Sequence, residues 1–515
     1  MADRDYDAVV IGAGHNGLVC AAYLARAGRR TLLVEARSIV GGTAASEPFA
    51  GATVNLCNCD HITFRTTPVM DELDLADHGL RYIDVEPAQL NAAWSGGAAW
   101  PQFHSVERTL DALGATHPHE VNGYRRYAAA AMPAVRLILD AAAEPPRART
   151  LARVLAARRG RGSSTLLRWS RRSAADVARH HFRSDALQGP LLATGPMVWG
   201  ISPEQPGSGL GALAYALRHV GRLGRPVGGS GMVPESLRRA FVAHGGEVRT
   251  STPVGAITCE GGRVRGVALD DGTEITADVV VSACDPRRTF LSWLRNPPPQ
   301  ARDLVRRWQS IPQADGYESK IDAVMTEVPR LTALDDALTA RLGVEHGAAT
   351  TVIAPSIAEI HRGAEMMARG QILDRPALLV NVPTVLDPSM GPTGRHVLSL
   401  EALYTPYGLQ GGWPQSPEPG RWLDRFAEVC QPGWRESVGE WRVMTPDRYE
   451  RDLHLPRGHA NSFAGGPLAA LRNRNPELTR YETPVQGLYL TGAATFPGAG
   501  VWGASGRNAA LTILR

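Results

Sequence analysis

Three glycines near the amino terminus have the spacing needed to hold a phosphate group. Gly12, Gly14 and Gly17 form a G-x-G-x-x-G pattern directly after the apolar run 8–11. Glycines at these positions allow a tight turn, a close approach of the backbone to a pyrophosphate, and close packing of a helix on a strand. The start of that helix offers unpaired N–H groups and the positive end of its dipole. The chemistry predicted here is the binding of a dinucleotide through its pyrophosphate.

The residues around these glycines predict the elements that must position them. The run 8–11 fits a buried parallel strand, residues 18–27 are mostly helix formers that end at Gly28, and residues 31–34 fit a second strand. Glu35 follows the second strand, where a carboxylate accepts hydrogen bonds from a ribose diol. Its negative charge would repel a 2′-phosphate, so NADP is disfavoured at this site.

The same glycine spacing recurs near the carboxyl end of the sequence. Gly498, Gly500 and Gly503 match it, but no second strand and acidic residue follow them. We therefore expect this copy to form a glycine-rich turn before a helix rather than an independent dinucleotide site.

Both ends of the chain, with one segment between them, resemble a known family. The relevant stretches are Gly41-Gly42-Thr43, residues 228–241 (GGSGMVPESLRRAF) and residues 487–508. They resemble the phytoene desaturase-like branch of the FAD-dependent amine oxidase superfamily, and within it the members called pyridine nucleotide-disulfide oxidoreductase domain 2 proteins. The resemblance implies that the dinucleotide is FAD rather than NAD.

The cofactor contacts follow from the glycine fingerprint and from this resemblance together. Backbone N–H groups of residues 500–502 can point at the N1/C2=O edge of a flavin and stabilise negative charge on the reduced ring. The resemblance implies that Val254 lies against adenine and that Gly492 and Ala493 lie against the pyrophosphate and ribityl chain, although many flavoproteins carry an acidic residue where this chain has Ala493. The predicted FAD contacts are Gly12, Gly14, His15, Asn16, Gly17, Glu35, Ala36, Arg37, Gly41, Gly42, Thr43, Val254, Gly492, Ala493, Gly500, Val501 and Trp502.

Lys320 and His61 are the candidate catalytic residues. Lys320 is the only lysine in the chain, and its position resembles that of an amine oxidase lysine that binds a water beside flavin N5. Such a lysine assists proton transfer or the reaction of the reduced flavin with oxygen; the alternative is an ordinary surface lysine. His61, with Asn58, is a candidate to face the flavin ring, and the alternative for His61 is a structural histidine with satisfied hydrogen bonds.

Composition excludes several classes of protein. The chain has 515 residues, 43% of them hydrophobic, and a formal charge of +4, which is too small to indicate nucleic acid binding. Its six cysteines lack C-x-x-C spacing, so we expect neither a metal site nor a disulfide framework. No apolar run approaches the roughly 18 residues of a membrane-spanning helix, and residues 1–7 lack the features of a signal peptide. We therefore expect a cytoplasmic protein.

One segment has an unusual charge. Residues 147–183 contain eleven arginines and a single acidic residue, Asp176, with Leu166, Leu167, Trp169 and Val177 interleaved. This pattern fits either a solvated basic helical face or peripheral contact with an anionic membrane surface.

The pattern of apolar runs predicts an α/β fold in two domains. A Rossmann-type FAD-binding domain is assembled from the discontinuous segments 1–84, 225–290 and 455–515. An α+β substrate domain comprises segments 85–224 and 291–454, of which 85–224 is a helical insertion and 291–454 contributes a mixed sheet with strands near 320–325, 377–382 and 396–403.

These expectations favour an FAD-dependent dehydrogenase, or desaturase, that acts on a largely apolar small molecule. The substrate would transfer a hydride to flavin N5, and because there is one nucleotide site, the electrons would pass to oxygen, a quinone or another external acceptor. The alternatives are an amine or amino-acid oxidase that makes an imine and hydrogen peroxide, a redox-neutral flavin isomerase, and a non-catalytic flavin-binding partner. Five tryptophans, Trp94, Trp100, Trp199, Trp413 and Trp441, either line an apolar chamber or belong to the core.

Overall fold

A parallel sheet organises the part of the molecule that contains the glycine fingerprint. The computed structural model describes residues 4–57, 59–460, 462–463 and 474–515. The parallel strands lie side by side in the order β9 (Glu247–Arg249), β2 (Thr31–Val34), β1 (Tyr6–Ile11), β12 (Glu274–Ser282) and β18 (Leu488–Leu490). Three separate stretches of the chain therefore supply this sheet, and the predicted α/β fold is confirmed.

The strands of this sheet are apolar because both of its faces are covered. Residues 8–11 and all of β2 are buried, as is typical of parallel strands between layers of helices. On one face, α1 (His15–Arg26) lies between α10 (Met232–Ala243) and α19 (Ala504–Ile513). The helix that was predicted after the second glycine pattern, α19, thus packs directly against α1, which follows the first glycine pattern.

An antiparallel extension continues from β12. Strands β10 (Val254–Glu260) and β11 (Arg263–Leu269) form a meander with the first half of β12. The second half of β12 is the apolar run that pairs with β1. One strand, β12, therefore belongs to both the meander and the parallel sheet.

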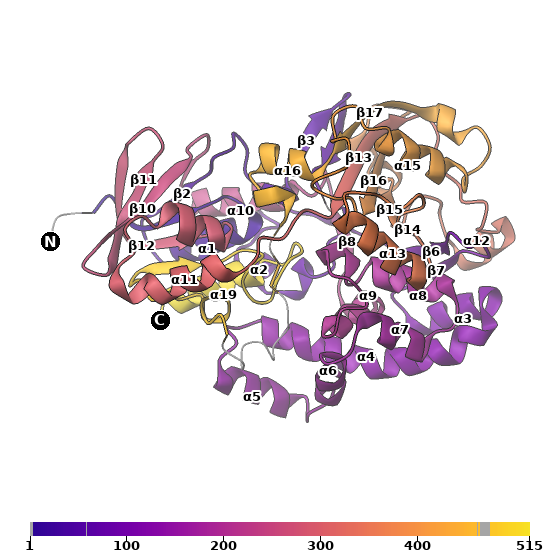
Figure 1. Ribbon diagram of the computed structural model, residues 1–515, viewed down its shortest axis with the longest axis horizontal. Coiled ribbons are helices and arrows are strands. Elements are labelled where there is room, and N and C mark those ends of the chain that lie inside the picture. Colours follow the sequence, from indigo (N-terminus) through magenta and orange to yellow (C-terminus); the bar gives the residue numbers. More distant parts are fainter. Residues whose placement is uncertain (1–3, 58, 461, 464–473) are drawn as a thin grey trace.

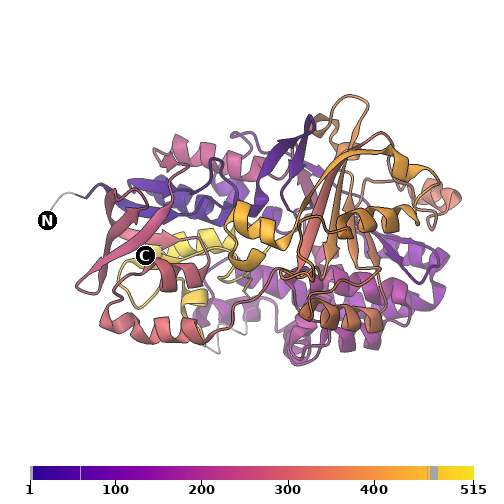
Figure 2. The same ribbon diagram turned by 45° about the horizontal axis from the view of Figure 1, so that its top comes forward.

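A second, mixed sheet forms the other part of the molecule (Figures 1 and 2). Its order is β17 (Val438–Met444), β13 (Glu318–Met325), β16 (His396–Leu403), β15 (Leu378–Asn381), β14 (Thr351–Ala354), β6 (Gln89–Ala93) and β7 (Trp100–Gln102). All pairs are antiparallel except β14 with β6. The expectation that segment 85–224 is a helical insertion is thus incomplete, because its first residues supply β6 and β7.

Helices cover both faces of the second sheet. On one side, α8 (Asp185–Ala193) contacts β6 and β14, and α3 (Val106–Thr116) contacts β7. The helices α4 (Val121–Ala142), α5 (Ala148–Ala157), α6 (Ser163–Trp169), α7 (Ala174–His181) and α9 (Ala214–Val220) belong to the same helical cluster, drawn in purple and magenta in Figure 1. On the other, Trp422 and Phe426 of α15 (Glu418–Ala427) pack in one core with Ile321 of β13 and Leu400 of β16. The strand residues of this core occupy alternate positions, so the side chains between them point to the opposite face of the sheet.

The remaining elements connect these layers. They are β3 (Ser46–Phe49) and β4 (Ala52–Asn55), which form a hairpin; β5 (Tyr82–Asp84), which pairs with β8 (Gly224–Pro226); and the helices α2 (Val69–Glu72), α11 (Arg302–Ser310), α12 (Asp336–Leu342), α13 (Ile357–Ala368), α14 (Pro383–Leu386), α16 (Pro446–Leu453) and α18 (Glu477–Arg480).

The arginine-rich segment folds into α5, α6 and α7. Of its interleaved apolar residues, Leu166, Trp169 and Val177 are buried in the helical core, whereas Leu167 is exposed. Most of these apolar side chains therefore face the protein, and membrane contact through 147–183 stays a prediction. Within the residues described, none of the helices combines the length and apolar composition needed to span a bilayer.

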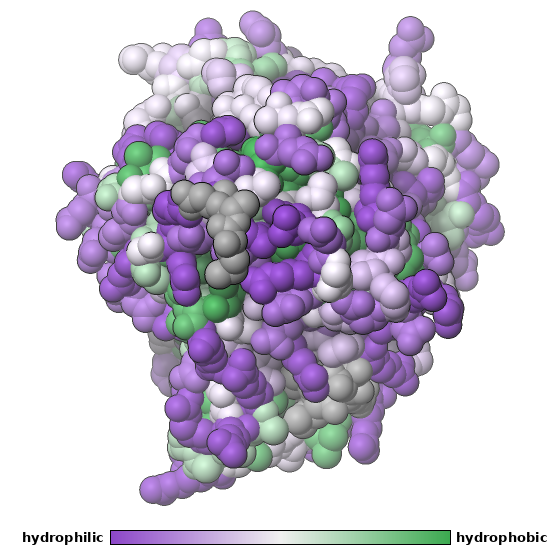
Figure 3. Space-filling view, turned by 90° about the vertical axis from the view of Figure 1, so that its left-hand side faces the viewer, coloured by the Kyte–Doolittle hydropathy of each residue, from purple (hydrophilic) through white to green (hydrophobic). Residues whose placement is uncertain are grey.

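The end of the molecule that carries the first sheet presents a mostly hydrophilic surface, with small hydrophobic spots between polar side chains (Figure 3). The cysteines of the described part of the chain, Cys20, Cys57, Cys59, Cys259, Cys284 and Cys430, are all free thiols.

Candidate active site

An elongated cavity follows the carboxyl ends of β1, β2 and β12, and it collects most of the predicted cofactor contacts. Residues that line it are Gly12, Gly14, His15, Asn16, Gly17, Glu35, Ala36, Arg37, Gly41, Gly42, Thr43, Val254, Gly492 and Ala493. Ligands of open α/β sheets bind at this edge, outside the carboxyl ends of the strands. Residues from the two ends of the chain thus meet around one groove, as the discontinuous arrangement of the first sheet requires.

The start of α1 has the geometry of a phosphate site. The helix begins after Gly14, and among the described residues it has no side-chain cap, so its first N–H groups remain available to a ligand. A Cβ added to Gly14 would have no protein atom within 4 Å, because this position faces the groove. Gly12 has φ +97°, which glycine adopts without strain.

Gly17 has a different role from Gly14. A Cβ at Gly17 would lie 2.0 Å from Gly12 O and 3.0 Å from Ala283 Cβ, so glycine is required for α1 to pack on β1 and β12. We expect Gly17→Ala to lower the free energy of unfolding by about 3 kcal/mol, at the upper end of overpacking effects, and to abolish FAD binding.

Two matched variants separate folding from ligand binding in this experiment. Gly14→Ala should keep the melting temperature of the FAD-free protein but weaken FAD binding, since its Cβ projects into the groove. Gly114→Ala, at a position in α3 with open space around it, should leave FAD binding unchanged and raise the stability by at most about 1 kcal/mol, because alanine favours a helix more than glycine does. Denaturant unfolding and FAD titration measure both quantities, and a Gly17→Ala protein that is as stable as the unmodified chain would contradict the packing described here.

Glu35 organises the turn beside the groove as well as facing it. Its Oε2 accepts a hydrogen bond from the backbone N–H of Ala13 (2.7 Å), and its Oε1 accepts one from that of Arg37 (3.0 Å). Each carboxylate oxygen keeps a further lone pair, so Glu35 can still accept a ribose hydroxyl. The Nη1 of Arg37 is buried and finds no partner among the described residues, which leaves one donor for an acceptor on a ligand. These features fit an extended dinucleotide.

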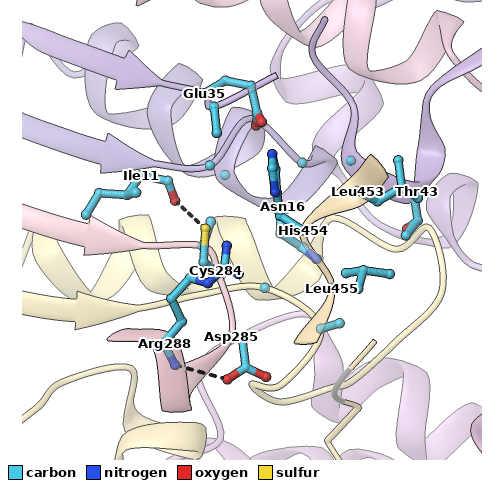
Figure 4. Close-up of a pocket in the computed structure, with 18 of the residues that line it drawn as sticks. Ile11, Asn16, Glu35, Thr43, Cys284, Asp285, Arg288, Leu453, His454 and Leu455 are labelled. Carbon is cyan, nitrogen blue, oxygen red and sulfur yellow. Dashed lines mark hydrogen bonds between the residues drawn. The ribbon is translucent and has the colours of Figure 1, made fainter. Parts of the chain in front are cut away.

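Part of the groove comes from residues that the sequence analysis did not predict. Cys284, Asp285 and Arg288 follow β12, and residues 453–456 approach from the end of α16 (Figure 4). Cys284 Sγ donates to Ile11 O (3.5 Å), and Asp285 Oδ1 accepts from the backbone N–H of Arg288 (3.2 Å). The end of β12 was a predictable location, because parallel strands end at one edge of a sheet, whereas the approach of α16 depends on tertiary packing.

A second cavity opens from one end of the first. Five residues line both cavities: His15, Thr43, Leu455, Ala460 and Ala493. Gly500 and Val501 line the second cavity at this junction, whereas Trp502 is not among the described lining residues of either. We call the second cavity the chamber. A dinucleotide that follows the groove from Glu35 past the start of α1 would end at the chamber.

Both apolar and polar side chains line the chamber. Its apolar lining residues are Ile62, Val198, Trp199, Leu379, Leu455, Ala460 and Val501, and its polar ones include Cys57, Asp60, Arg218, Glu318, Thr350, Asn381 and Glu401. Of the five tryptophans considered above, Trp199 lines the chamber, Trp94, Trp100 and Trp413 are buried in cores, and Trp441 is exposed. The core alternative is thus confirmed for Trp94, Trp100 and Trp413, Trp199 lines the chamber, and Trp441 fits neither alternative. Part of the chamber wall is polar.

Strand alternation builds this polar wall. Glu318, Lys320 and Asp322 occupy alternate positions of β13, and Glu401 of β16 is directly opposite Lys320. All four side chains therefore share one face of the second sheet, opposite the apolar core formed by Ile321 and its neighbours. The alternation E-x-K-x-D was visible in the sequence, but the sequence does not reveal that this face lines a cavity.

The two glutamates of the wall hold protons more tightly than ordinary glutamates. Burial raises the pKa of Glu401, and the neighbouring Glu318 raises it further, against the opposing effect of Lys320. Burial also raises the pKa of Glu318, partly offset by a hydrogen bond from Cys57 and by Lys320. Two such groups in the lining of the chamber are placed to exchange protons near neutral pH.

Lys320 is buried among the side chains of this wall rather than at the protein surface, and it is not among the described residues that line the chamber. It is fully buried, its Nζ donates to Asn55 O (2.7 Å) and forms an ion pair with Asp322. Burial lowers the pKa of Lys320, but Asp322, Cys59 and Glu401 raise it by more, so the pKa is above its usual value and the ammonium stays charged. The surface-lysine alternative is thus wrong, while the predicted contact with a flavin-bound water stays a prediction.

His61 has the geometry of a structural residue. It is buried, its Nδ1 lies 2.9 Å from Tyr82 Oη, and its Nε2 lies 3.0 Å from Ser230 Oγ. It is not among the described residues that line either cavity, and burial lowers its pKa to about 3. Asn58 lies outside the described residues. His15 instead is the histidine at the junction of the two cavities, and burial lowers its pKa to about 4, so its ring is neutral at pH 7.

Comparison with known proteins agrees with this arrangement. The family model for flavin containing amine oxidoreductase matches residues 17–317. Pyridine nucleotide-disulfide oxidoreductase domain-containing protein 2 of Rattus norvegicus is 30% identical over 99% of this chain and 94% of its own length. A limonene dehydrogenase subunit of Castellaniella defragrans is 26% identical over 99% of this chain and 94% of its own length.

A solved structure extends the agreement to the fold. Cyclohexylamine oxidase from Brevibacterium oxydans superposes with a TM-score of 0.59 at 15% sequence identity, covering 99% of this chain and 98% of that one. The resemblance inferred from the sequence motifs is confirmed by the extent of these matches. The chain belongs to the family of flavin-containing amine oxidoreductases.

Proposed function

We propose that this protein is an FAD-dependent oxidoreductase that dehydrogenates a small, largely apolar molecule. The observation that carries the proposal is the junction of the two cavities at His15, Thr43 and Ala493. A groove with a dinucleotide fingerprint leads there to a separate chamber with room for a second molecule. The name of one relative, the limonene dehydrogenase of Castellaniella defragrans, describes a dehydrogenation and supports the same reaction class.

In this proposal the cofactor and the protein have separate tasks. FAD, when bound, supplies the acceptor for a hydride from the substrate. The start of α1, Glu35 and Arg37 would hold its pyrophosphate and adenosine portions. The neutral ring of His15 and the backbone at Gly500 and Val501 would border the end of the cofactor that faces the chamber.

Dehydrogenation also releases a proton, and the polar wall provides an acceptor. Breaking two bonds to hydrogen while one double bond forms in the substrate yields one hydride and one proton. Glu401 and Glu318 line the chamber, and in their ionised forms either can accept that proton. Their ion-paired neighbour Lys320 stabilises the ionised form of both carboxyl groups.

Amine oxidation is the second candidate, and the polar wall is the observation that favours it. Carboxylates at Glu318 and Glu401 would hold an ammonium group of a substrate by charge-assisted hydrogen bonds. Anaerobic mixing with panels of alkenes, alcohols, acids and amines tests both candidates, since a substrate bleaches the oxidised flavin spectrum. Product analysis then separates a carbon–carbon double bond from an imine. If no compound of any panel reduces the flavin, both candidate functions are contradicted.

The electrons are expected to leave to oxygen, a quinone or another external acceptor, because the fingerprint provides one dinucleotide site. Adding each acceptor to the substrate-reduced protein and following the return of the oxidised spectrum identifies it. The chamber's lining includes Trp199, which is partly exposed at 37%, so an apolar substrate or acceptor can contact an apolar surface before entering.

A further inference from the structure

Arg218 is a buried cation that faces the chamber and that no carboxylate of the described residues binds directly. It belongs to α9, lines the chamber, and is 7% exposed. In the described part of the chain its guanidinium makes one hydrogen bond, from Nη1 to the carbonyl of Ala214 in its own helix (3.2 Å). Its Nε is buried with no hydrogen-bond partner among the same residues. An arginine has five N–H donors, so most of this group's capacity is unused.

The acidic side chain that acts most strongly on Arg218 is already engaged elsewhere. Asp60 raises the pKa of Arg218 through its charge, although burial has the larger effect and lowers it. However, Asp60 Oδ1 accepts from Arg225 Nε (2.7 Å), and its Oδ2 accepts from Thr350 Oγ1. Arg225 also donates to Asn381 Oδ1 (2.8 Å). Asp60 thus acts on Arg218 through its charge while its oxygens accept hydrogen bonds from Arg225 and Thr350.

A buried charge without a partner lowers the stability of the folded protein, so it is uncommon outside functional sites. Other salt bridges of the protein show that this chain pairs its arginines readily; Arg507, for example, binds Glu72 through two nitrogens. Arg218 differs because it lines a cavity and no carboxylate of the described residues binds its guanidinium. A planar oxyanion in the chamber would supply the acceptors that the protein does not.

We propose that Arg218 is the binding site for an oxyanion, most simply a carboxylate, on the substrate. This inference rests on the proposed function, which assigns the chamber to a substrate. It adds that the substrate has an apolar body and an anionic end, the first along Val198, Trp199 and Leu379 and the second at Arg218.

Small aromatic probes test this inference on the FAD-loaded protein. Benzoate and phenyl phosphate carry a carboxylate and a phosphate, and benzamide is the neutral counterpart of benzoate. Binding is followed by the change in the visible spectrum of the flavin and by calorimetry. We expect benzoate to bind the unmodified protein, and Arg218→Met to weaken that binding by about 10- to 100-fold, the loss typical of a hydrogen bond to a charged group. Benzamide should bind both proteins equally.

Matched variants and a direct observation complete the test. Arg222→Met, an exposed arginine just beyond α9, should leave benzoate binding unchanged. Comparison of benzoate with phenyl phosphate shows which oxyanion the site prefers, and either preference fits the inference. If Arg218→Met does not fold, a crystal structure of the unmodified protein with benzoate decides: a carboxylate within hydrogen-bond distance of Arg218 supports the inference, and benzoate bound elsewhere overturns it.

Failure of this inference is distinguishable from failure of the proposed function. A protein that retains FAD but binds benzoate equally well with Met at 218 refutes the anion site and leaves the dehydrogenase proposal intact. A protein that binds no FAD refutes the proposed function, while calorimetry of benzoate with the FAD-free protein still tests Arg218.

Discussion

Replacing Glu401 with glutamine is expected to slow reduction of the bound flavin by substrate by about 10²- to 10⁴-fold, the usual contribution of a general base. Glutamine has nearly the same shape but accepts no proton at neutral pH. Because burial and Glu318 raise the pKa of Glu401, the unmodified protein should react faster as the pH rises through neutrality, since the carboxylate is the form that accepts a proton. This dependence should disappear in Glu401→Gln, and anaerobic stopped-flow measurement across the pH range checks both effects.

Two comparisons make this experiment specific to the chamber. Glu440→Gln, at an exposed position of β17, should retain the rate and the pH dependence of the unmodified protein. Glu318→Gln should lower the pKa of Glu401 by removing a neighbouring negative charge, and so move the pH profile to lower pH. A Glu401→Gln protein with an unchanged rate and profile would remove the polar wall from the mechanism.

Replacing Lys320 with methionine should have the largest effect on stability. The change leaves the Asn55 carbonyl without its donor and removes one of the cationic partners of the buried Asp322, whose other partner, Arg442, donates to it from Nε (3.2 Å) and Nη2 (3.1 Å). Breaking a buried ion pair from one side typically costs about 3–5 kcal/mol. We expect a loss of this size in the free energy of unfolding, measured by denaturant titration.

The same variant tests two roles of Lys320: the stabilisation of neighbouring carboxylates, and the predicted assistance of the reaction of reduced flavin with oxygen. Ile321→Met, the next residue of β13 on the opposite, apolar face, is the control and should cost less than about 1.5 kcal/mol. Loss of the ammonium should raise the pKa of Glu401 further and move the pH profile of flavin reduction upward. If reoxidation of the reduced flavin by oxygen is also slowed, the predicted contact with a flavin-bound water gains support. Unchanged stability, pH profile and reoxidation together would contradict both roles.

Local patterns in the sequence were sufficient to predict many of the residues that line the groove. The fingerprint glycines and Glu35 lie within one strand-helix-strand unit, whose geometry is nearly fixed by residue type and spacing. Gly492 and Ala493, far away in the sequence, were placed in the same groove by resemblance to a family, and they line it. Trp502 was predicted as a cofactor contact together with its neighbours Gly500 and Val501. Gly500 and Val501 line the chamber, whereas Trp502 is not among the described lining residues. The conformation of an irregular turn does not follow from its glycine spacing alone.

The chamber was less predictable, because its walls come from segments that meet only after folding. Arg218 is followed by His219 in a helix whose other residues are mostly buried and apolar, and nothing in the local sequence separates it from a surface arginine. Glu401 is an isolated acidic residue in an apolar strand, which signals an unusual environment but not its partner. Lys320 was singled out by its rarity, and the structure shows that it is buried with acidic neighbours.

The central claim of this account is that separate parts of the chain bind one FAD molecule in the groove beside Glu35. Titration of the purified FAD-free protein with FAD, followed by the visible spectrum and by calorimetry, tests it most directly. We predict saturation at one FAD per chain, with affinity weakened in Gly14→Ala and unaffected in Gly114→Ala. A folded protein that stays colourless with excess FAD, or that binds FAD equally well with alanine at 14, would contradict the claim.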